Sequence, residues 1–440
     1  MKDSIYPNYQ MRKTRTEQAG PSPECPEYEW LIVGGGLQGC YFAGLLSHLC
    51  GRGKVAILDP QPRLLHRWLK RSDACHMKYM RSTSMHHLAP DPGDLLDFAR
   101  ISGYGEEHFT EPYLRPSLTL FNAHCRRVLE TFRLGEIHIC GRLCRLSKLD
   151  SGGWQVRYLD TEDRESGLRS QNILLALGDQ GEYRPDSTLG EQYEQSPHLS
   201  SVDFSFDEVL AKTFRWQARK PKQASDICLV GGGISSAQMA LYLLEQGLKV
   251  QIDSRYPLRS FQFDSDPGWL FKFLPKFRAE TDLQKRWQII MEERHKGSVP
   301  PRLYESLLGY QQQGRLLLGS REARDGSDSD GFGVCGAIPV VLATGLRYET
   351  PDWLLEVARE LGLPLLRTAA GEKPALDSSL EWDSERAPGL YLTGRLAELF
   401  LGPSAGNISG ARVAARYLPI ESEHPGSFLG GGSYGYRDRT

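Results

Sequence analysis

Residues 30–39 read WLIVGGGLQG, an apolar segment that runs directly into glycines at positions 34, 36 and 39. In a dinucleotide-binding unit with this spacing, the first glycine allows a tight turn and the second lets a pyrophosphate approach the backbone. The third lets the following helix pack closely on the strand, and the phosphates lie at the N-terminus of that helix. We therefore predict a nucleotide-binding turn at Gly34, Gly36 and Gly39.

The residues after this turn complete the pattern of a βαβ unit. Apolar residues recur at helical spacing from Phe42 to Leu49, and Val55–Leu58 reads as a second buried strand. Asp59 ends that strand, close to where a ribose hydroxyl needs a hydrogen-bond acceptor. Three glycines could serve a turn alone, but the order of strand, helix, strand and terminal acid favours a nucleotide site.

A second glycine-rich turn repeats the first one further along the chain. Residues 227–237 read ICLVGGGISSA, with Gly231 and Gly233 at the first two glycine positions. Ser236 replaces the third glycine and follows Ser235, so a small residue is kept. Repetition of the motif at this scale predicts two nucleotide-binding units in one chain.

The strand after the second turn carries the residues that distinguish NADPH from NADH. Residues 249–255 read KVQIDSR. Asp253 alone would suit a free ribose hydroxyl, whereas Arg255 with Ser254 could hold a 2′-phosphate. The pattern favours NADPH, with NADH as the alternative if Arg255 is an ordinary surface residue.

Two later strands also end in glycine. Residues 339–345 read PVVLATG and residues 389–394 read GLYLTG, followed by a predicted helix at 411–417. A strand and closing helix after the second unit imply that the chain returns to the first. The sequence thus predicts an α/β protein with two Rossmann-like domains of three layers (ββα), the second inserted into the first.

The composition narrows the class of partner. The 440 residues are 40% hydrophobic and 25% charged, with a net charge of −2, which is typical of a globular protein that binds small molecules. We expect neither nucleic acid nor an integral membrane segment, because no apolar run of about 18 residues occurs. The polar first 28 residues predict no secretory signal, so a cytoplasmic location is expected. The nine scattered cysteines do not form a disulfide pattern.

With two glycine-rich turns, Ala-Thr-Gly at 343–345 and Thr-Gly at 393–394, the chain resembles the flavoproteins that have two dinucleotide-binding domains. It is most similar to the class B flavin monooxygenases, especially the N-hydroxylating branch that acts on ornithine, lysine and related amines. The residues that carry this resemblance are 77–92, 196–201 and 231–236. Gly394 is followed by Arg395, where FAD-binding motifs commonly have Asp.

The resemblance implies FAD in the first unit and NADPH, or alternatively NADH, in the inserted one. The implied domains are an FAD domain at 29–205 and 346–420 and an inserted NAD(P)H domain at 206–345. A mobile arm at 1–28 and a Gly-rich tail at 421–440 flank them. The predicted cofactor-binding residues are Gly34, Gly36, Gly39, Asp59, Gly231, Gly233, Ser235, Ser236, Arg255, Thr344, Gly345 and Gly394.

The resemblance also implies a reaction. NADPH reduces the flavin, the reduced flavin adds O₂ to give a peroxyflavin, and this oxygenates a soft nucleophile such as a small amine. Arg81 is our candidate for a charge near the flavin or nicotinamide, and His198 for a hinge residue beside the active site. Arg81 could instead pair with an acid, and His198 could cap a turn.

The same sequence is compatible with other functions. His86 and His87 are adjacent, but neighbours in sequence rarely face one metal, so a packed or solvated role is favoured and no metal site is predicted. An NAD(P)H-dependent flavin reductase or electron-transfer enzyme would use the same scaffold without oxygen insertion. A catalytically silent nucleotide-binding flavoprotein is the third reading. A homo-oligomer is compatible with the sequence, which names no substrate.

Overall fold

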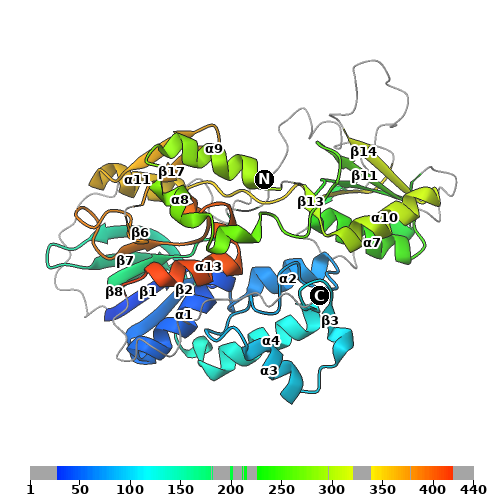
Figure 1. Cartoon of the computed structure of the whole chain (residues 1–440). Helices are drawn as coiled ribbons and strands as arrows, with labels where there is room; N and C mark the ends of the chain where they lie inside the picture. Colours follow the sequence, from blue (N-terminus) through cyan, green and yellow to red (C-terminus); the bar gives the residue numbers. More distant parts are fainter. Residues whose placement is uncertain are drawn as a thin grey trace.

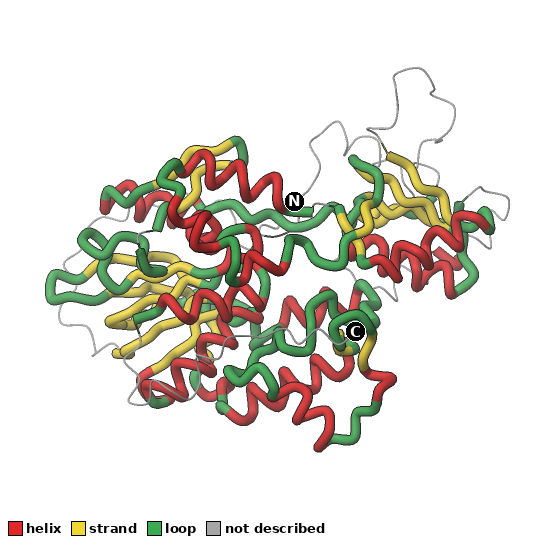
Figure 2. The backbone as a smooth tube through the Cα atoms, in the orientation of Figure 1, coloured by secondary structure: helices red, strands yellow, loops and turns green. Residues whose placement is uncertain are grey.

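The computed structural model describes residues 27–179, 181, 199–201, 211, 213–215, 225–295, 297–320, 338–376 and 378–419. Two lobes, each built on a largely parallel sheet, lie side by side (Figure 1; Figure 2). The predicted arm at 1–28, apart from its last two residues, and the predicted tail at 421–440 lie outside the described residues.

The first lobe contains a 7-stranded sheet. Its centre is the predicted unit, in which β1 runs parallel to both β2 and β8. The C-terminal half of β8 also pairs in parallel with β18, while its N-terminal half pairs antiparallel with β7. The strand order is β5 (His138–Cys140), β2 (Val55–Asp59), β1 (Glu27–Val33), β8 (Glu165–Leu175), β7 (Trp154–Leu159) and β6 (Arg142–Lys148), with β18 (Leu390–Leu392) beside β8.

The second lobe contains a 5-stranded parallel sheet. Its order is β14 (Leu316–Ser320), β11 (Val250–Ser254), β10 (Ile227–Val230), β15 (Val340–Leu342) and β9 (Leu199–Ser201). Because β18 lies in the first sheet although it follows the second, the second domain is inserted, as predicted. The second sheet includes β9, which precedes the predicted boundary at residue 206.

Helices cover both sheets. Helix α1 packs on β1 and β2, and α7 and α10 pack together beside β10, β11 and β14 (Figure 1). The helices are α1 (Leu37–Cys50), α2 (His66–Ala74), α3 (Asp94–Ile101), α4 (Leu118–Thr131), α7 (Ile234–Glu245), α8 (Leu274–Ala279), α9 (Leu283–Glu293), α10 (Pro301–Gln312), α11 (Asp352–Leu361), α12 (Glu398–Leu401) and α13 (Ile408–Ala414). Within the described residues, no helix is both long and apolar enough to cross a membrane.

One segment departs from the predicted domain plan. After β11 the chain crosses back to the first lobe, and Trp269, Phe277 and Ile290 join the core around β1 and β8. It then returns through β13 (Ser298–Val299) to α10. In the opposite direction, Cys75 from the end of α2 joins the core of the second lobe. Residues from each lobe therefore complete the core of the other.

Candidate functional site

The first glycine turn has the geometry that a dinucleotide site needs. Gly34 has a φ of +116°, and a Cβ there would clash with the carbonyl oxygen of Ala176. A Cβ on Gly39 would clash with the carbonyl oxygen of Gly34, so close packing of α1 on β1 requires glycine. Gly36 differs, because no described atom lies within 4 Å of a Cβ built there. Gly34 is thus required by the fold, whereas Gly36 leaves open space at the turn for a ligand.

Gly36 faces a cavity of about 380 Å³ at the N-terminus of α1. The first turn, the ends of β2 and β8, helix α2 and residues 394–395 enclose it. Gly394 adjoins the turn because the Thr393 hydroxyl donates to Gln38 Oε1 at 2.9 Å. The residues that line it include Gly36, Asp59, Arg67, Arg71, Cys75, Met77, Asp179, Ser235, Tyr348, Gly394 and Arg395.

Asp59 lies at this cavity, where a ribose was predicted. Its carboxylate accepts hydrogen bonds from the backbone N–H groups of Gly35 at 2.6 Å and Gln61 at 2.8 Å. A carboxylate offers about four acceptor positions, so both bonds can coexist with a ligand hydroxyl. Asp59 therefore fastens the turn to β2 while lining the predicted ribose position.

Three guanidinium groups also line the cavity, and the sequence did not single them out as ligands. Arg71 pairs with Asp179 at 2.8 Å, and Arg67 lies 3.7 Å from the same carboxylate. The guanidinium carbon of Arg395 lies 4.1 Å from the centre of the Tyr348 ring. The Nε of Arg395 is buried and has no hydrogen-bond partner in the described part of the chain. This excess of cations, with the open Gly36 cradle, fits an anionic pyrophosphate.

The second glycine turn repeats the geometry of the first. Gly231 has a φ of +137°, and a Cβ there would clash with the carbonyl oxygen of Ala343. No described atom lies within 4 Å of a Cβ built on Gly233. Ser236 is fully buried at the third position, and Thr344 and Gly345 follow β15 beside the turn. The second turn therefore offers a second open cradle at the N-terminus of α7.

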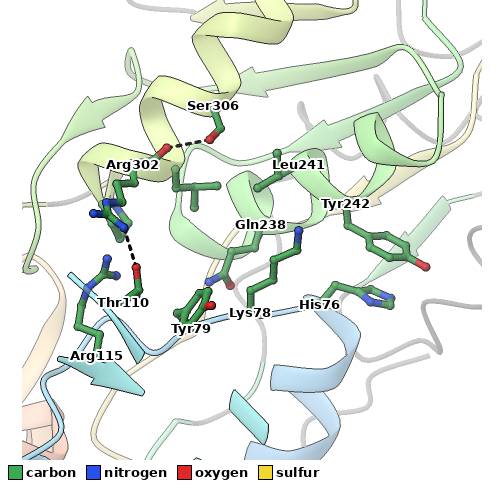
Figure 3. Close-up of a pocket in the computed structure, with 12 residues that line it drawn as sticks. His76, Lys78, Tyr79, Thr110, Arg115, Gln238, Leu241, Tyr242, Arg302 and Ser306 are labelled. Atoms are coloured by element: carbon green, nitrogen blue, oxygen red, sulfur yellow. Dashed lines mark hydrogen bonds between the residues drawn. The ribbon is translucent and has the colours of Figure 1, made fainter. Parts of the chain in front are cut away.

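Ser235 connects the two units. It is the second residue of α7 yet lines the cavity of the first turn, where its side chain hydrogen-bonds the thiol of Cys75. The segment 75–79 forms a wall here, with Cys75 and Met77 on the cavity side. A second cavity, of about 350 Å³, lies against His76, Lys78 and Tyr79 of the same segment (Figure 3).

The residues predicted to choose the nicotinamide cofactor lie at the end of β11. Asp253 is buried, and the Ser254 hydroxyl donates to the carbonyl oxygens of Tyr256 at 2.6 Å and Gly319 at 3.1 Å. Arg255 follows them and is exposed. The geometry leaves Arg255 accessible for a phosphate, and its predicted role stays a prediction.

Arg81 does not line the cavity of the first turn. It donates to the carbonyl oxygens of Gln262 at 2.8 Å and Phe261 at 2.9 Å, and to the Ser298 hydroxyl at 2.8 Å. Burial lowers the pKa of Arg81. The side chain thus fastens the segment after α2 to the strands that lead back to the second lobe. His198, the other predicted catalytic residue, lies outside the described residues.

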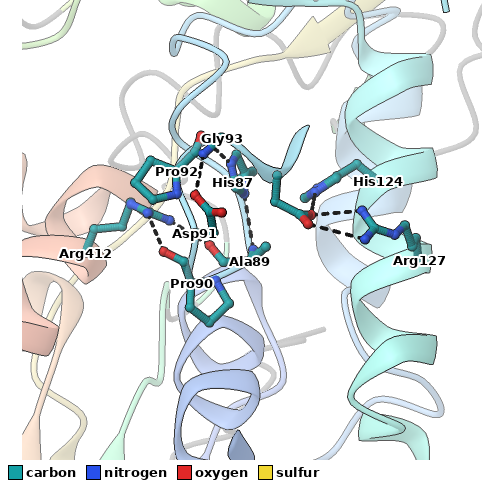
Figure 4. Close-up of polar contacts among 10 residues, drawn as sticks. His87, Ala89, Pro90, Asp91, Pro92, Gly93, His124, Arg127 and Arg412 are labelled. Atoms are coloured by element: carbon teal, nitrogen blue, oxygen red, sulfur yellow. Dashed lines mark hydrogen bonds and ion pairs between the residues drawn. The ribbon is translucent and has the colours of Figure 1, made fainter. Parts of the chain in front are cut away.

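His87 belongs to a buried polar cluster (Figure 4). Its Nδ1 accepts from the Ala89 N–H at 3.2 Å, so its Nε2 donates to the Pro92 carbonyl at 3.0 Å. Beside it, His124 Nε2 lies 2.7 Å from Asp94, whose pKa is lowered by that hydrogen bond. Arg412 donates to the carbonyl oxygens of Ala89 and Pro90. The cluster joins the segment 86–94 to α4 and α13, so His87 has the packed role that the sequence favoured.

We expect the cluster to make stability depend on pH. Burial lowers the pKa of His87 to about 3 and that of His86 to about 4, below the value of about 6.5 in an unfolded chain. The unfolded state therefore takes up protons first, and stability present above pH ~6.5 is lost as the pH falls. Each histidine should contribute a slope of about 1.4 kcal/mol per pH unit between roughly pH 6 and 4.

Urea unfolding at a series of pH values measures this slope. His87→Gln keeps a side-chain donor but cannot titrate, so its curve should be shallower than that of the parent. His48→Gln, in the last turn of α1, serves as the control. Parallel curves for the parent and His87→Gln would contradict the expectation.

The comparisons with known proteins agree with this geometry. Residues 31–180 match a protein-family model described as FAD-NAD(P)-binding. Among curated proteins, no sequence matches the chain. Solved structures do share its fold over most of both chains.

Three of these structures are a cadaverine monooxygenase and two ornithine hydroxylases. One is the FAD-bound cadaverine monooxygenase of the desferrioxamine biosynthetic pathway from Erwinia amylovora, with a TM-score of 0.66, 16% identity, and coverage of 92% of this chain and 99% of that one. The ornithine N-hydroxylase of Kutzneria sp. 744, with reduced FAD, NADP⁺ and L-ornithine, has a TM-score of 0.63 and 15% identity, with coverage of 88% of this chain and 97% of that one. The reduced ornithine hydroxylase of Pseudomonas aeruginosa has a TM-score of 0.61 and 18% identity, with coverage of 88% of this chain and 97% of that one. At these identities the likeness is one of fold, and it confirms the predicted two-domain α/β architecture.

Proposed function

We propose that this chain is an FAD-dependent oxidoreductase that uses NAD(P)H, and that it acts as a monooxygenase on a small amine or another soft nucleophile. The observation that carries the proposal is the position of Ser235. A residue of the second nucleotide turn lines the cavity of the first turn, so ligands of the two cradles would meet. The solved structures of the same fold that hold FAD, NADP⁺ and an amino acid support this assignment.

Each group of residues would have a distinct task. Gly36 and the N-terminus of α1 would receive the pyrophosphate of FAD, with Asp59 at its ribose and Arg395 as a nearby cation. Gly233 and Ser235 would hold the nicotinamide cofactor at the N-terminus of α7. When bound, FAD would supply the redox chemistry, accepting a hydride from NAD(P)H and then reacting with O₂.

The protein itself would orient the two cofactors and exclude water. Tyr348 is half-buried at the cavity, and desolvation raises the pKa of its hydroxyl, so the side chain is neutral near pH 7. Its ring holds the guanidinium of Arg395 beside the cofactor position. No side-chain nucleophile is required in this scheme.

A single preparation tests the proposal. The purified chain should turn yellow with FAD, and NADPH should bleach the flavin without oxygen. On addition of oxygen with ornithine, lysine or cadaverine, one amine should give a hydroxylamine in proportion to the NADPH consumed. Hydrogen peroxide with every amine and no hydroxylamine would favour the reductase reading. A yellow protein whose flavin NADPH does not bleach would favour the catalytically silent flavoprotein, and failure to bind FAD would overturn the proposal.

Arg255 gives a separate prediction about the hydride donor. Arg255→Gln should raise KM for NADPH about tenfold and leave KM for NADH nearly unchanged, because only NADPH carries a 2′-phosphate. Steady-state oxidation of both cofactors measures this. Equal changes for both would remove Arg255 from the phosphate site.

A further inference from the structure

The second cavity and the cofactor cavity lie on opposite sides of the segment 75–79. Along the wall at 75–79, Cys75 and Met77 face the cofactor cavity, whereas His76 and Lys78 face the second one. Along α7, Ser235 faces the first and Gln238 the second. Residues of α10 and of the short strands β3 (Phe109–Thr110) and β4 (Arg115–Pro116) complete the second cavity (Figure 3). It is therefore separate from the space assigned to FAD.

Two guanidinium groups mark one end of this cavity. Arg115 is only 4% exposed, and its donors reach the carbonyl oxygens of Met80, Glu111 and Pro112 at 3.1–3.4 Å. Arg302 donates to the Thr110 hydroxyl at 3.0 Å, and Figure 3 shows its guanidinium facing that of Arg115. Among the described residues, neither forms an ion pair. Lys78, in contrast, bonds both carboxylate oxygens of Glu245 at 2.7 and 2.9 Å.

The electrostatics of this pair favour an anion. Burial is the main cause of the lowered pKa of Arg115, and the positive charge of Arg302 lowers it further, while Glu111 acts in the opposite direction. A carboxylate between the two groups would relieve that repulsion and form charge-assisted hydrogen bonds. The first turn of α10 also borders this end, and in the described structure no side chain caps it.

Gln238 adds a second requirement. Its side chain is 9% exposed and lines the cavity, and its buried Oε1 has no hydrogen-bond partner in the described part of the chain. A buried carbonyl without a donor loses its hydration without replacement, and a ligand O–H or N–H would restore a hydrogen bond to it. A neutral hydroxyl fits better than an ammonium group here, because the nearby arginines would repel a cation. Leu241 and Leu303 also line the cavity and supply apolar surface to it.

We propose that this cavity binds a small 2-hydroxy carboxylic acid, with its carboxylate at Arg115 and Arg302, its hydroxyl at Gln238 and a short aliphatic chain against Leu241 and Leu303. The site is independent of the proposed redox activity, since it uses no residue of the cofactor cavity. Its ligand would contact both lobes at once, because Arg115 belongs to the first and Arg302 to the second.

Calorimetric titration of the full chain tests the site with matched probes. The probes are 2-hydroxy-4-methylpentanoate, 4-methylpentanoate without the hydroxyl, and inorganic phosphate. The hydroxy acid should bind saturably and at least about tenfold more tightly than either of the others. No saturable binding, or equal binding of phosphate, would overturn the proposal.

Three variants identify the groups involved. Arg302→Gln should weaken binding of the hydroxy acid about tenfold or more. Gln238→Leu should remove the preference for the hydroxylated acid, so that the two acids bind alike. Arg416→Gln, an exposed arginine of the segment Ala415–Tyr417, carries the same charge change away from the cavity and should bind as the parent does. Equal binding by the parent and Arg302→Gln would contradict the assignment, and thermal unfolding of each variant shows whether it is folded.

Discussion

Replacing Gly36 by Ala is expected to give a folded but colourless protein. In the unliganded chain no described atom lies within 4 Å of a Cβ at this position, and the backbone is extended with φ −78°. Alanine should therefore cost the fold only about 0.5–1 kcal/mol as an N-cap residue. The same methyl group would occupy the space through which a pyrophosphate approaches the backbone. We expect FAD affinity to fall at least ~100-fold, or about 2.7 kcal/mol.

Two matched glycines make this experiment specific. Gly34→Ala should destabilise the chain itself by about 1–3 kcal/mol, because of the positive φ and the clash with Ala176. Gly233→Ala should keep the bound flavin but slow its reduction by NADPH, since it fills only the second cradle. Visible absorbance after gel filtration reports FAD, and thermal unfolding without FAD reports the fold. A yellow Gly36→Ala protein with unchanged affinity would show that the pyrophosphate does not lie there.

The second large effect is expected at Glu398, which is 1% exposed. Its carboxylate lies 2.6 Å from Arg294 Nη2 and 3.1 Å from Lys373 Nζ. Burial alone raises the pKa of a carboxyl, but these cations hold the pKa of Glu398 below its ordinary value. Glu398→Ala would leave both cations buried without their partner. We expect the free energy of unfolding to fall by about 3–5 kcal/mol.

Urea unfolding of the FAD-free chain measures this loss. Glu398→Gln keeps the shape and an acceptor, so it should lie between the parent and Glu398→Ala. Asp97→Ala breaks the exposed pair with Arg100 and should have no measurable effect. Stability of Glu398→Ala equal to that of the parent would show that the buried cations find other partners.

The sequence predicted the parts of the fold that depend on local backbone requirements. The glycines at 34, 36 and 39 and the strands around them were found because a tight turn and close helix packing need glycine, whatever the rest of the chain does. The packing of α9 against the first lobe was not predicted. The sequence of an amphipathic helix shows that it has an apolar face, but it does not show which core that face covers.

The same distinction applies to the candidate site. Arg67, Arg71 and Tyr348 come from two distant segments, and only tertiary packing makes them neighbours of the first glycine turn. Arg395 stood out in the sequence because it replaces the Asp that is common in FAD-binding motifs. That substitution did not predict where its side chain lies. Arg81 was predicted to lie near the flavin or nicotinamide, and that role stays a prediction. Its carbonyl partners at 261–262 lie too far along the chain for any local pattern to reveal them.

The exchange of core residues between the lobes has an evolutionary consequence. Trp269 and Ile290 complete the first core although they follow β11, and Cys75 completes the second although it precedes β9. Recombination that transferred one nucleotide-binding unit without the other would separate each core from the residues that complete it. The transferred unit would then expose apolar side chains to solvent. Descendants of this protein should therefore diverge by point substitution and loop insertion, with both units inherited together.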